Sequence, residues 1–166
     1  AALQHRVALD LAATDLPNDP AVAPTNRSAW LADTGQIEWR LLDSGRGRLV
    51  VRAPRFRAAL GRIADSLVEL GDGVSVRFGP TRLGSATFAL VVTEGEALPR
   101  GPLRAIVAAT AYTENTDMRW TSPEMRSVGR AWGTAPSRVE PVPMELRLTG
   151  ARGVLQPLDI QRLTIA

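Results

Sequence analysis

Short runs in which apolar and polar residues alternate, separated by turns rich in glycine and proline, recur along this chain of 166 residues. An alternation with a period of two is typical of half-buried strands. Short strands at such intervals are typical of antiparallel sandwiches and barrels rather than of βαβ units. The strand-like runs cover residues 3–11, 37–41, 48–52, 74–78, 86–93, 105–113, 139–148 and 158–165. We therefore predict one all-β domain over residues 1–166, an antiparallel β-sandwich of the jelly-roll type.

Residues 56–70 allow a second interpretation. Their apolar side chains fall at helical spacing, Pro54 is a suitable helix start and Gly71 a suitable helix end. Periodicity alone therefore favours an amphipathic helix here. Gly61, in the middle of the segment, argues against a helix because glycine weakens helix interiors. One short helix stays an alternative within the all-β prediction.

The residue composition excludes several classes of protein. The chain has no cysteine, so it has no disulfide framework and no thiolate nucleophile or metal ligand. His5 is the only histidine, which excludes a multi-histidine metal site. No segment approaches the ~20 uninterrupted apolar residues that span a bilayer. We expect a domain that folds without disulfide bonds or bound metal and that has no membrane partner.

All 20 basic residues are arginine, and this raises the sequence pI to 10.8 although the net charge is only +3. Arginine is always protonated near neutral pH, so a high pI does not imply a strong positive field. The arginines are spread from Arg6 to Arg162 among 17 acidic residues. A nucleic-acid interface needs them clustered on one face, so we expect no nucleic-acid partner.

The stretch from Leu103 to Leu148 joins two strand-like runs through a long polar loop. Long loops without secondary structure are uncommon in compact domains and are usually functional or disordered. Two tryptophans, Trp120 and Trp132, argue against disorder. We therefore regard this loop as the candidate functional region.

Tryptophan beside planar hydrogen-bonding groups indicates a carbohydrate site, because sugar rings present apolar C–H faces together with hydroxyls. The candidate carbohydrate-binding residues are Trp120, Asn115, Asp117, Arg119, Arg126 and Trp132. Alternatively, both indoles anchor the loop against the sandwich. Trp39 lies in a predicted strand and is expected in the core, whereas Trp30 fits either role.

A glycosidase needs two carboxyl groups across the scissile bond. The loop and its flanks offer Glu114, Asp117, Glu124 and Glu140. The sequence does not fix their separations, and no catalytic residue is assigned. We expect instead that Glu140 pairs with Arg126 or Arg130 and ties the loop to the strand base.

Asp33-Thr34-Gly35 is also the triplet of aspartic proteases, in which two such loops share a proton. The chain contains one copy, so a protease would have to be a homodimer. We therefore interpret the triplet as an Asx-type turn that leads into a strand.

A resemblance to a known family rests on a series of motifs between about residues 33 and 148. They are Asp33-Thr34-Gly35-Gln36-Ile37-x-Trp39, Val51-x-x-Pro54-Arg55, Leu70-Gly71-Asp72, Glu114-Asn115-Thr116-x-Met118-x-Trp120 and Arg126-Ser127-Val128-Gly129-x-x-Trp132-Gly133-x-x-Pro136-x-x-Val139-Glu140. Together they resemble the β-sandwich domain that follows the catalytic barrel in bacterial agarase-like and related glycoside hydrolases. The block from Glu114 to Glu140 is the most specific.

The resemblance implies a non-catalytic accessory domain that binds polysaccharide or braces a catalytic (β/α)₈ barrel. Such a barrel needs ~250 residues, so this chain would be an excised domain or a fold used alone. The resemblance also implies a secreted or cell-surface location, and two short strands rather than a helix over residues 56–70. No cofactor is expected apart from a structural calcium ion, although no EF-hand spacing occurs. The alternatives are a small stand-alone carbohydrate-active hydrolase and a β-sandwich protein-interaction module.

Overall fold

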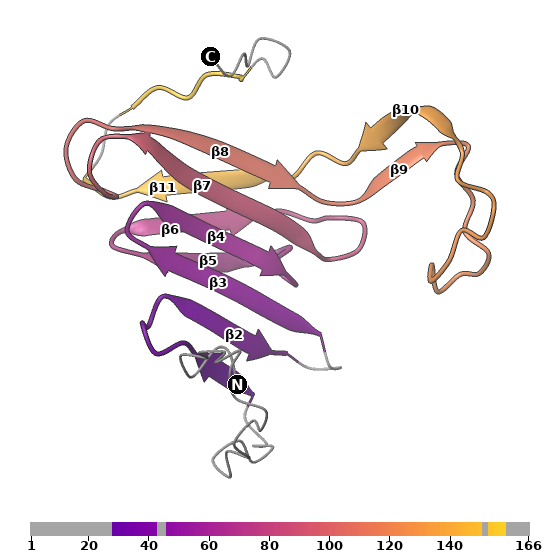
Figure 1. Cartoon of the computed structure of the whole chain (residues 1–166), viewed down its shortest axis with the longest axis horizontal. Coiled ribbons are helices and arrows are strands. Elements are labelled where there is room, and N and C mark those ends of the chain that lie inside the picture. Colours follow the sequence, from indigo (N-terminus) through magenta and orange to yellow (C-terminus); the bar gives the residue numbers. More distant parts are fainter. Residues whose placement is uncertain (1–27, 43–45, 151–152, 159–166) are drawn as a thin grey trace, which may run out of the picture.

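The computed structural model describes residues 28–42, 46–150 and 153–158, which form strands, turns and loops (Figure 1). The strands are β1 (Ala29–Leu31), β2 (Ile37–Leu41), β3 (Gly47–Ala53), β4 (Phe56–Gly61), β5 (Leu67–Gly71), β6 (Val74–Phe78), β7 (Ala86–Glu94), β8 (Arg104–Thr110), β9 (Thr113–Thr116), β10 (Thr134–Val139) and β11 (Met144–Leu148). None of the described segments is a helix long and apolar enough to cross a lipid bilayer.

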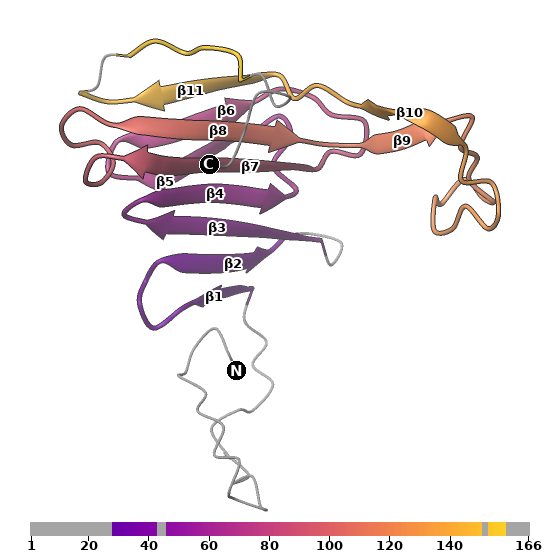
Figure 2. The ribbon, with the colours of Figure 1, turned by 45° about the horizontal axis from the view of Figure 1, so that its top comes forward.

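The strands form two packed sheets and one projecting hairpin, and all neighbouring strands are antiparallel. The larger sheet has six strands in the order β1-β2-β3-β4-β7-β8, and the smaller has three in the order β11-β6-β5. The chain leaves the larger sheet after β4 and returns to it for β7 and β8, and β11, the last strand of the described residues, lies in the smaller sheet (Figure 2). The predicted all-β, antiparallel β-sandwich is confirmed.

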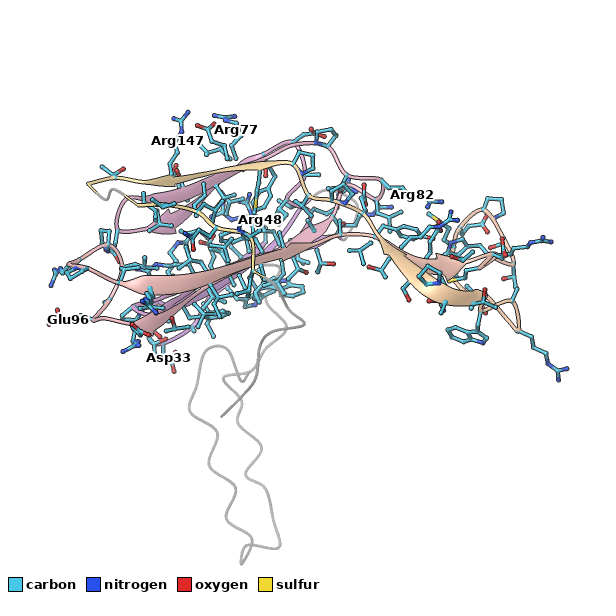
Figure 3. All side chains as sticks on the ribbon, turned by 90° about the horizontal axis from the view of Figure 1, so that it is seen from above. Asp33, Arg48, Arg77, Arg82, Glu96 and Arg147 are labelled. Carbon is cyan, nitrogen blue, oxygen red and sulfur yellow. The ribbon has the colours of Figure 1, made fainter. Side chains whose placement is uncertain are left out.

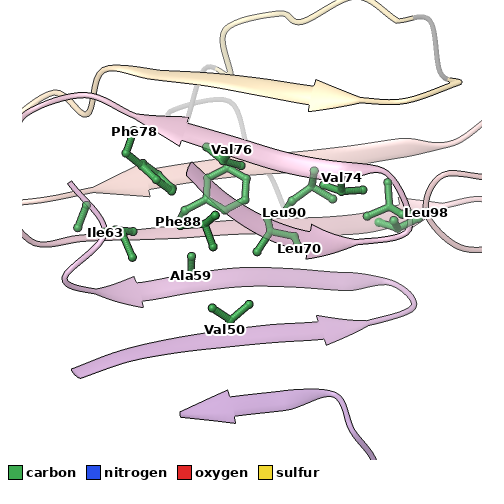
Figure 4. Close-up of a cluster of buried hydrophobic side chains, with 13 residues drawn as sticks. Val50, Ala59, Ile63, Leu70, Val74, Val76, Phe78, Phe88, Leu90 and Leu98 are labelled. Carbon is green, nitrogen blue, oxygen red and sulfur yellow. The ribbon is translucent and has the colours of Figure 1, made fainter. Parts of the chain in front are cut away.

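The core lies between the two sheets, and the alternation of β7 explains how it forms. Ala86, Phe88, Leu90 and Val92 are buried, whereas the residues between them are more exposed. From the smaller sheet, the ring of Phe78 meets Phe88 edge-on at a centroid distance of 6.0 Å (Figure 4). Burying a large apolar side chain of this kind stabilises the fold by about 1.5–3 kcal/mol.

Residues 56–70 form β4 and β5 with a turn between them, as the resemblance implies, and the described residues contain no helix. The helical spacing does not mark one buried face, because Ile63 is fully buried while Leu67 is 44% exposed. Gly61 has a φ of +96°, and a Cβ atom there would lie 2.3 Å from the carbonyl oxygen of Gly47. This close approach of β3 to the end of β4 requires glycine and is incompatible with a helix interior.

The strands predicted at 37–41, 74–78 and 86–93 are confirmed, and two other boundaries are wrong. The run 105–113 is interrupted between β8 and β9. The run 139–148 contains only β11 in full, since β10 begins at Thr134 and Pro141 and Pro143 lie between the two strands. Proline removes the backbone donor that a ladder needs. The run 3–11 and all of 158–165 except Leu158 lie outside the described residues, and Leu158 is not in a strand.

The prediction that Trp39 lies in the core is wrong, because its side chain is 38% exposed. Trp39 is paired across strands with Leu49, whereas Val50, one residue further on, is buried. Since neighbouring residues of a strand point to opposite faces, Trp39 lies on the outer face of the larger sheet. When both faces of a strand carry apolar residues, the sequence alternation does not indicate which face the second sheet covers.

Candidate functional site in the projecting arm

β9, β10 and the loop between them extend beyond the sandwich as an arm, residues 113–139 (Figures 1 and 3). The two strands are antiparallel, with a register shift between Thr134 and Ser137. Every residue of β10 is exposed. The arm therefore depends on its own hydrogen bonds and on its base for its position.

Glu140 joins the base of the arm to the sandwich. Its carboxylate accepts hydrogen bonds from the backbone N–H of Arg82 at 2.7 Å and of Tyr112 at 3.2 Å. Its own N–H donates to the carbonyl of Tyr112 at 2.8 Å. The predicted structural role of Glu140 holds, but its predicted partners, Arg126 and Arg130, are wrong. The partners are backbone groups that approach only in the folded chain.

A chain of polar contacts continues from this base into the loop. The guanidinium of Arg82 lies 4.2 Å from the ring centroid of Tyr112 and 3.2 Å from a carboxylate oxygen of Glu114. The Tyr112 hydroxyl donates to Glu114 at 2.9 Å and accepts from the indole N–H of Trp120 at 2.7 Å. Figure 3 places Arg82 where the arm leaves the sandwich. One tyrosine hydroxyl thus links the loop to the arm base.

The same contacts fix the charge of Glu114. The hydrogen bond from Tyr112, followed by that from Arg82, holds the pKa of Glu114 below its ordinary value. A general acid of a glycosidase needs the opposite shift, a raised pKa that keeps the proton near neutral pH. Glu114 is therefore suited to structural pairing and not to proton donation.

The side chain of Asn115 forms its hydrogen bonds within the arm. Its amide nitrogen donates to the carbonyl of Trp132 at 2.9 Å, and its amide oxygen accepts from the hydroxyl of Ser137 at 2.7 Å. Gly133, next to Trp132, has a φ of +72°, and a Cβ atom there would lie 2.2 Å from the carbonyl oxygen of Thr116. These contacts hold the backbone on which Trp132 stands.

The tip of the loop is held by short-range hydrogen bonds. The backbone N–H of Arg119 donates to the carbonyl of Ala131 at 3.0 Å, and the backbone N–H of Thr121 donates to the carbonyl of Ser127 at 2.9 Å. Val128 is 6% exposed and is the buried apolar side chain of the tip. The loop is thus a structured element, consistent with the argument from its tryptophans.

The two loop tryptophans have different environments. The indole of Trp120 is half-buried, and its ring lies 6.5 Å from that of Tyr112. Trp132, in contrast, is 64% exposed. The side chains of Arg119 and Arg126 are exposed as well, as is Asp117, which has a φ of +60°. Of the six candidate residues, Trp132, Arg119, Arg126 and Asp117 therefore face solvent, while Asn115 and Trp120 hold the arm together.

Sequence reasoning missed Arg82 and Tyr112. Tyr112 is the only tyrosine of the chain and stands two residues before Glu114, which is the one signal that could have identified it. Arg82 lies in the turn between β6 and β7, 32 residues before Glu114 in the sequence. No local pattern predicts that pairing.

Outside the arm, a hollow of about 960 Å³ lies between the edges of β8 and β11. Its lining is apolar and includes Leu103, Val107, Leu146 and Leu148. No carboxylate lines it in the part of the chain that the structure describes. This hollow therefore lacks the paired carboxyl groups that glycoside hydrolysis requires.

Within residues 28–42, 46–150 and 153–158, no three histidine, aspartate or glutamate side chains lie together as metal ligands. Calcium in proteins takes six to eight oxygen ligands, several from carboxylates. The described residues offer no such cluster of carboxylates, and the structural calcium ion stays a prediction.

Comparison with known proteins found no matching family model, no matching curated protein and no matching solved structure. The resemblance to an accessory domain of glycoside hydrolases therefore depends on the sequence motifs alone.

Proposed function

We propose that the chain is a non-catalytic accessory domain of a polysaccharide-degrading glycoside hydrolase, and that its arm binds carbohydrate. The observation that carries the proposal is the position of Trp132, which is 64% exposed on an arm anchored at its base. Stacking of a sugar ring requires a free indole face on a backbone that does not move. Trp132 offers the first. The hydrogen bond from Asn115 to the carbonyl of Trp132, and the close packing of Gly133 against the backbone of Thr116, support the second.

Polar side chains near Trp132 in the loop could orient a bound sugar. Arg119 and Arg126 are exposed donors with planar guanidinium groups, and Asp117 is an exposed acceptor. Carbohydrate hydroxyls both donate and accept, and these side chains offer groups of both kinds. Trp132 is the better platform of the two loop tryptophans, because Trp120 is half-buried and its indole N–H is bonded to Tyr112.

The proposal is tested by retention of the chain on insoluble agarose, xylan and microcrystalline cellulose. We expect Trp132→Ala to weaken binding roughly threefold to tenfold, the equivalent of one aromatic contact. Its thermal midpoint should change little, because the side chain is largely exposed. A stable Trp132→Ala variant that binds as tightly as the original chain would overturn the role of the arm.

One observation favours a second candidate function, bracing of a catalytic barrel. β10 is exposed along its whole length, and Val139 is 59% exposed although it is β-branched and apolar. An arm with such a strand is suited to packing against another domain. Under this alternative the isolated chain binds none of the three polymers, and Val139→Asp lowers the thermal midpoint of the enzyme that contains the domain.

A further inference from the structure

The outer face of the six-stranded sheet carries a row of residues paired directly across the strands. The row is Trp30, Trp39, Leu49, Leu60, Thr87 and Thr110. Residues paired in this way lie on the same face of a sheet. The opposite face carries Val50, Ala59 and Phe88, which are buried in the core. The row therefore faces away from the smaller sheet.

Trp30 and Trp39 stand at one end of this row as direct neighbours on β1 and β2. Their Cα atoms are about 5 Å apart, as for any antiparallel pair, so one extended ligand crossing the strands would meet both indoles. Trp39 is 38% exposed, and Trp30 is half-buried. The two indoles are thus neighbours on a face of the sheet that no strand of the described residues covers.

The position of the Trp39 ring is set by Gly47 on β3. A Cβ atom at Gly47 would lie 2.8 Å from the indole atom Cζ2 of Trp39 and 3.2 Å from Cε2. The ring therefore occupies the place that a side chain at position 47 would take, and it lies over the backbone of the neighbouring strand. An indole that rests on one side against backbone offers its other side to solvent. Trp39 can therefore cover Gly47 with one side of its ring and bind a ligand with the other.

The surroundings of the pair are uncharged. The outward positions of β2, β3 and β4, and those of β7 and β8 that are paired with them, carry an apolar side chain, glycine or threonine. Glu94 and Arg104, which form an ion pair with each other, are the charged exception at the far corner of the face. Alanines at 58, 89 and 108 form a second paired row, which keeps the middle of the face flat. The part of the face around the two tryptophans thus offers no partner for a charged ligand, and it complements a neutral one.

The face is extended as well as flat. Six strands at about 4.8 Å spacing and about 20 Å length give a projected area on the order of 500 Å². A flat, extended face whose tryptophan end is uncharged suits a chain of neutral sugar rings.

We propose that Trp30 and Trp39 form a second carbohydrate-binding surface, separate from the arm, for a neutral polysaccharide lying flat on the sheet. This inference rests on the proposed polysaccharide-associated function and adds a site to it. With two sites on one domain, binding to an insoluble polymer would exceed what either site gives alone, because the second contact is intramolecular.

The test uses the full chain and microcrystalline cellulose or agarose as the probe, both being neutral and insoluble. The main variant is Trp39→Leu, which keeps an apolar cover over Gly47 and removes the aromatic face. Phe56→Leu is the matched control. Phe56 is 37% exposed on the same face, but it lies four residues along β4 from Leu60 of the row and is paired with Val91. Trp30→Leu is the second variant, for the case in which Trp39→Leu fails to fold.

We expect each tryptophan variant to lower retention roughly threefold to tenfold, and Phe56→Leu to leave it unchanged. Equal loss in Phe56→Leu, or normal retention of folded Trp39→Leu and Trp30→Leu, overturns the proposal. A dimer in sedimentation that Trp39→Leu dissociates also overturns it, because the face is then an interface between copies. Trp132→Ala distinguishes the two sites. If only Trp132→Ala loses retention, the arm is the binding site and the sheet face is not. If only Trp30→Leu and Trp39→Leu lose retention, the sheet face is the binding site and the arm is not.

Discussion

At the scale of single residues, the two tryptophans of the arm differ in what their indoles are free to do. The indole N–H of Trp120 is bonded to the hydroxyl of Tyr112 at 2.7 Å, whereas Trp132 stands in solvent. The sequence could not separate them, since both stand in polar, glycine- or proline-containing surroundings. The difference arises from a contact eight residues away that exists only once the loop has turned back.

The first prediction concerns Trp120→Ala. The side chain is half-buried and bonded, so we expect the free energy of unfolding to fall by about 2 kcal/mol, less than the ~3–5 kcal/mol for a fully buried aromatic. Trp120→Phe should cost only about 1 kcal/mol, since it keeps the ring and loses one hydrogen bond. Urea unfolding measures both. A Trp120→Ala variant as stable as the original chain would show that Trp120 does not anchor the loop.

The second prediction concerns the pH dependence that Glu114 confers. Its pKa is lowered in the folded state, so its pairing stabilises the fold above the ordinary pKa of about 4.3. That stabilisation is lost as the pH falls below this value through the folded pKa. We therefore expect the stability difference between the original chain and Glu114→Gln to shrink from pH 6 to pH 3.

Tyr112→Phe is the control for this prediction, because the tyrosine hydroxyl makes the largest contribution to the lowered pKa of Glu114. The variant should reduce the same acid dependence without removing the carboxylate. Thermal unfolding at a series of pH values measures the effect. A difference that grows as the pH falls would have the wrong sign for a carboxylate held ionised in the fold.

At the scale of elements, the arm depends on what happens where β8 becomes β9. Ala111 and Tyr112 interrupt the strand, and their backbone turns the chain out of the sheet. On the return path, Pro141 and Pro143 prevent β10 from running into β11. The prolines are visible in the sequence, but the interruption at Ala111 and Tyr112 is not, because tyrosine favours strands and alanine does not break them. This is why the arm was predicted only as a loop.

The third prediction tests the anchor of this arm with Glu140→Gln. The amide keeps one acceptor oxygen, but its nitrogen then faces a backbone N–H donor of Arg82 or Tyr112. The exposed N–H of Arg82 can bond to water instead, whereas loss of the half-buried partner of the Tyr112 N–H costs about 1–3 kcal/mol. We expect hydrogen exchange to accelerate in β9 and β10 more than in β4 and β7. Uniform acceleration across both sheets would mean that Glu140 stabilises the whole fold and is not a specific anchor of the arm.

At the scale of the whole molecule, the fold was largely predictable and the site was not. A period of two in runs such as 74–78 and 86–93 predicts strands because the inner face is truly apolar there. The same rule misplaced Trp39, because the larger sheet is apolar on its outer face as well. Pairings such as Arg82 with Glu114 depend on which sheet edges meet, and no local pattern encodes that. The family resemblance supplied the two strands of residues 56–70, where periodicity favoured a helix.

The last prediction concerns catalysis by the intact chain. Retaining and inverting glycosidases both need a carboxylic acid with a raised pKa beside a second carboxyl group. At the arm base, Glu114 has a lowered pKa, and Glu140 accepts hydrogen bonds with both carboxylate oxygens. The chain has no cysteine and one histidine to replace them. We therefore expect no release of reducing ends from agar, xylan or cellulose above background, measured over long incubations at several pH values. Hydrolysis that Glu114→Gln or Glu140→Gln abolishes, in variants shown to be folded, would instead make the arm base an active site and the chain a small hydrolase.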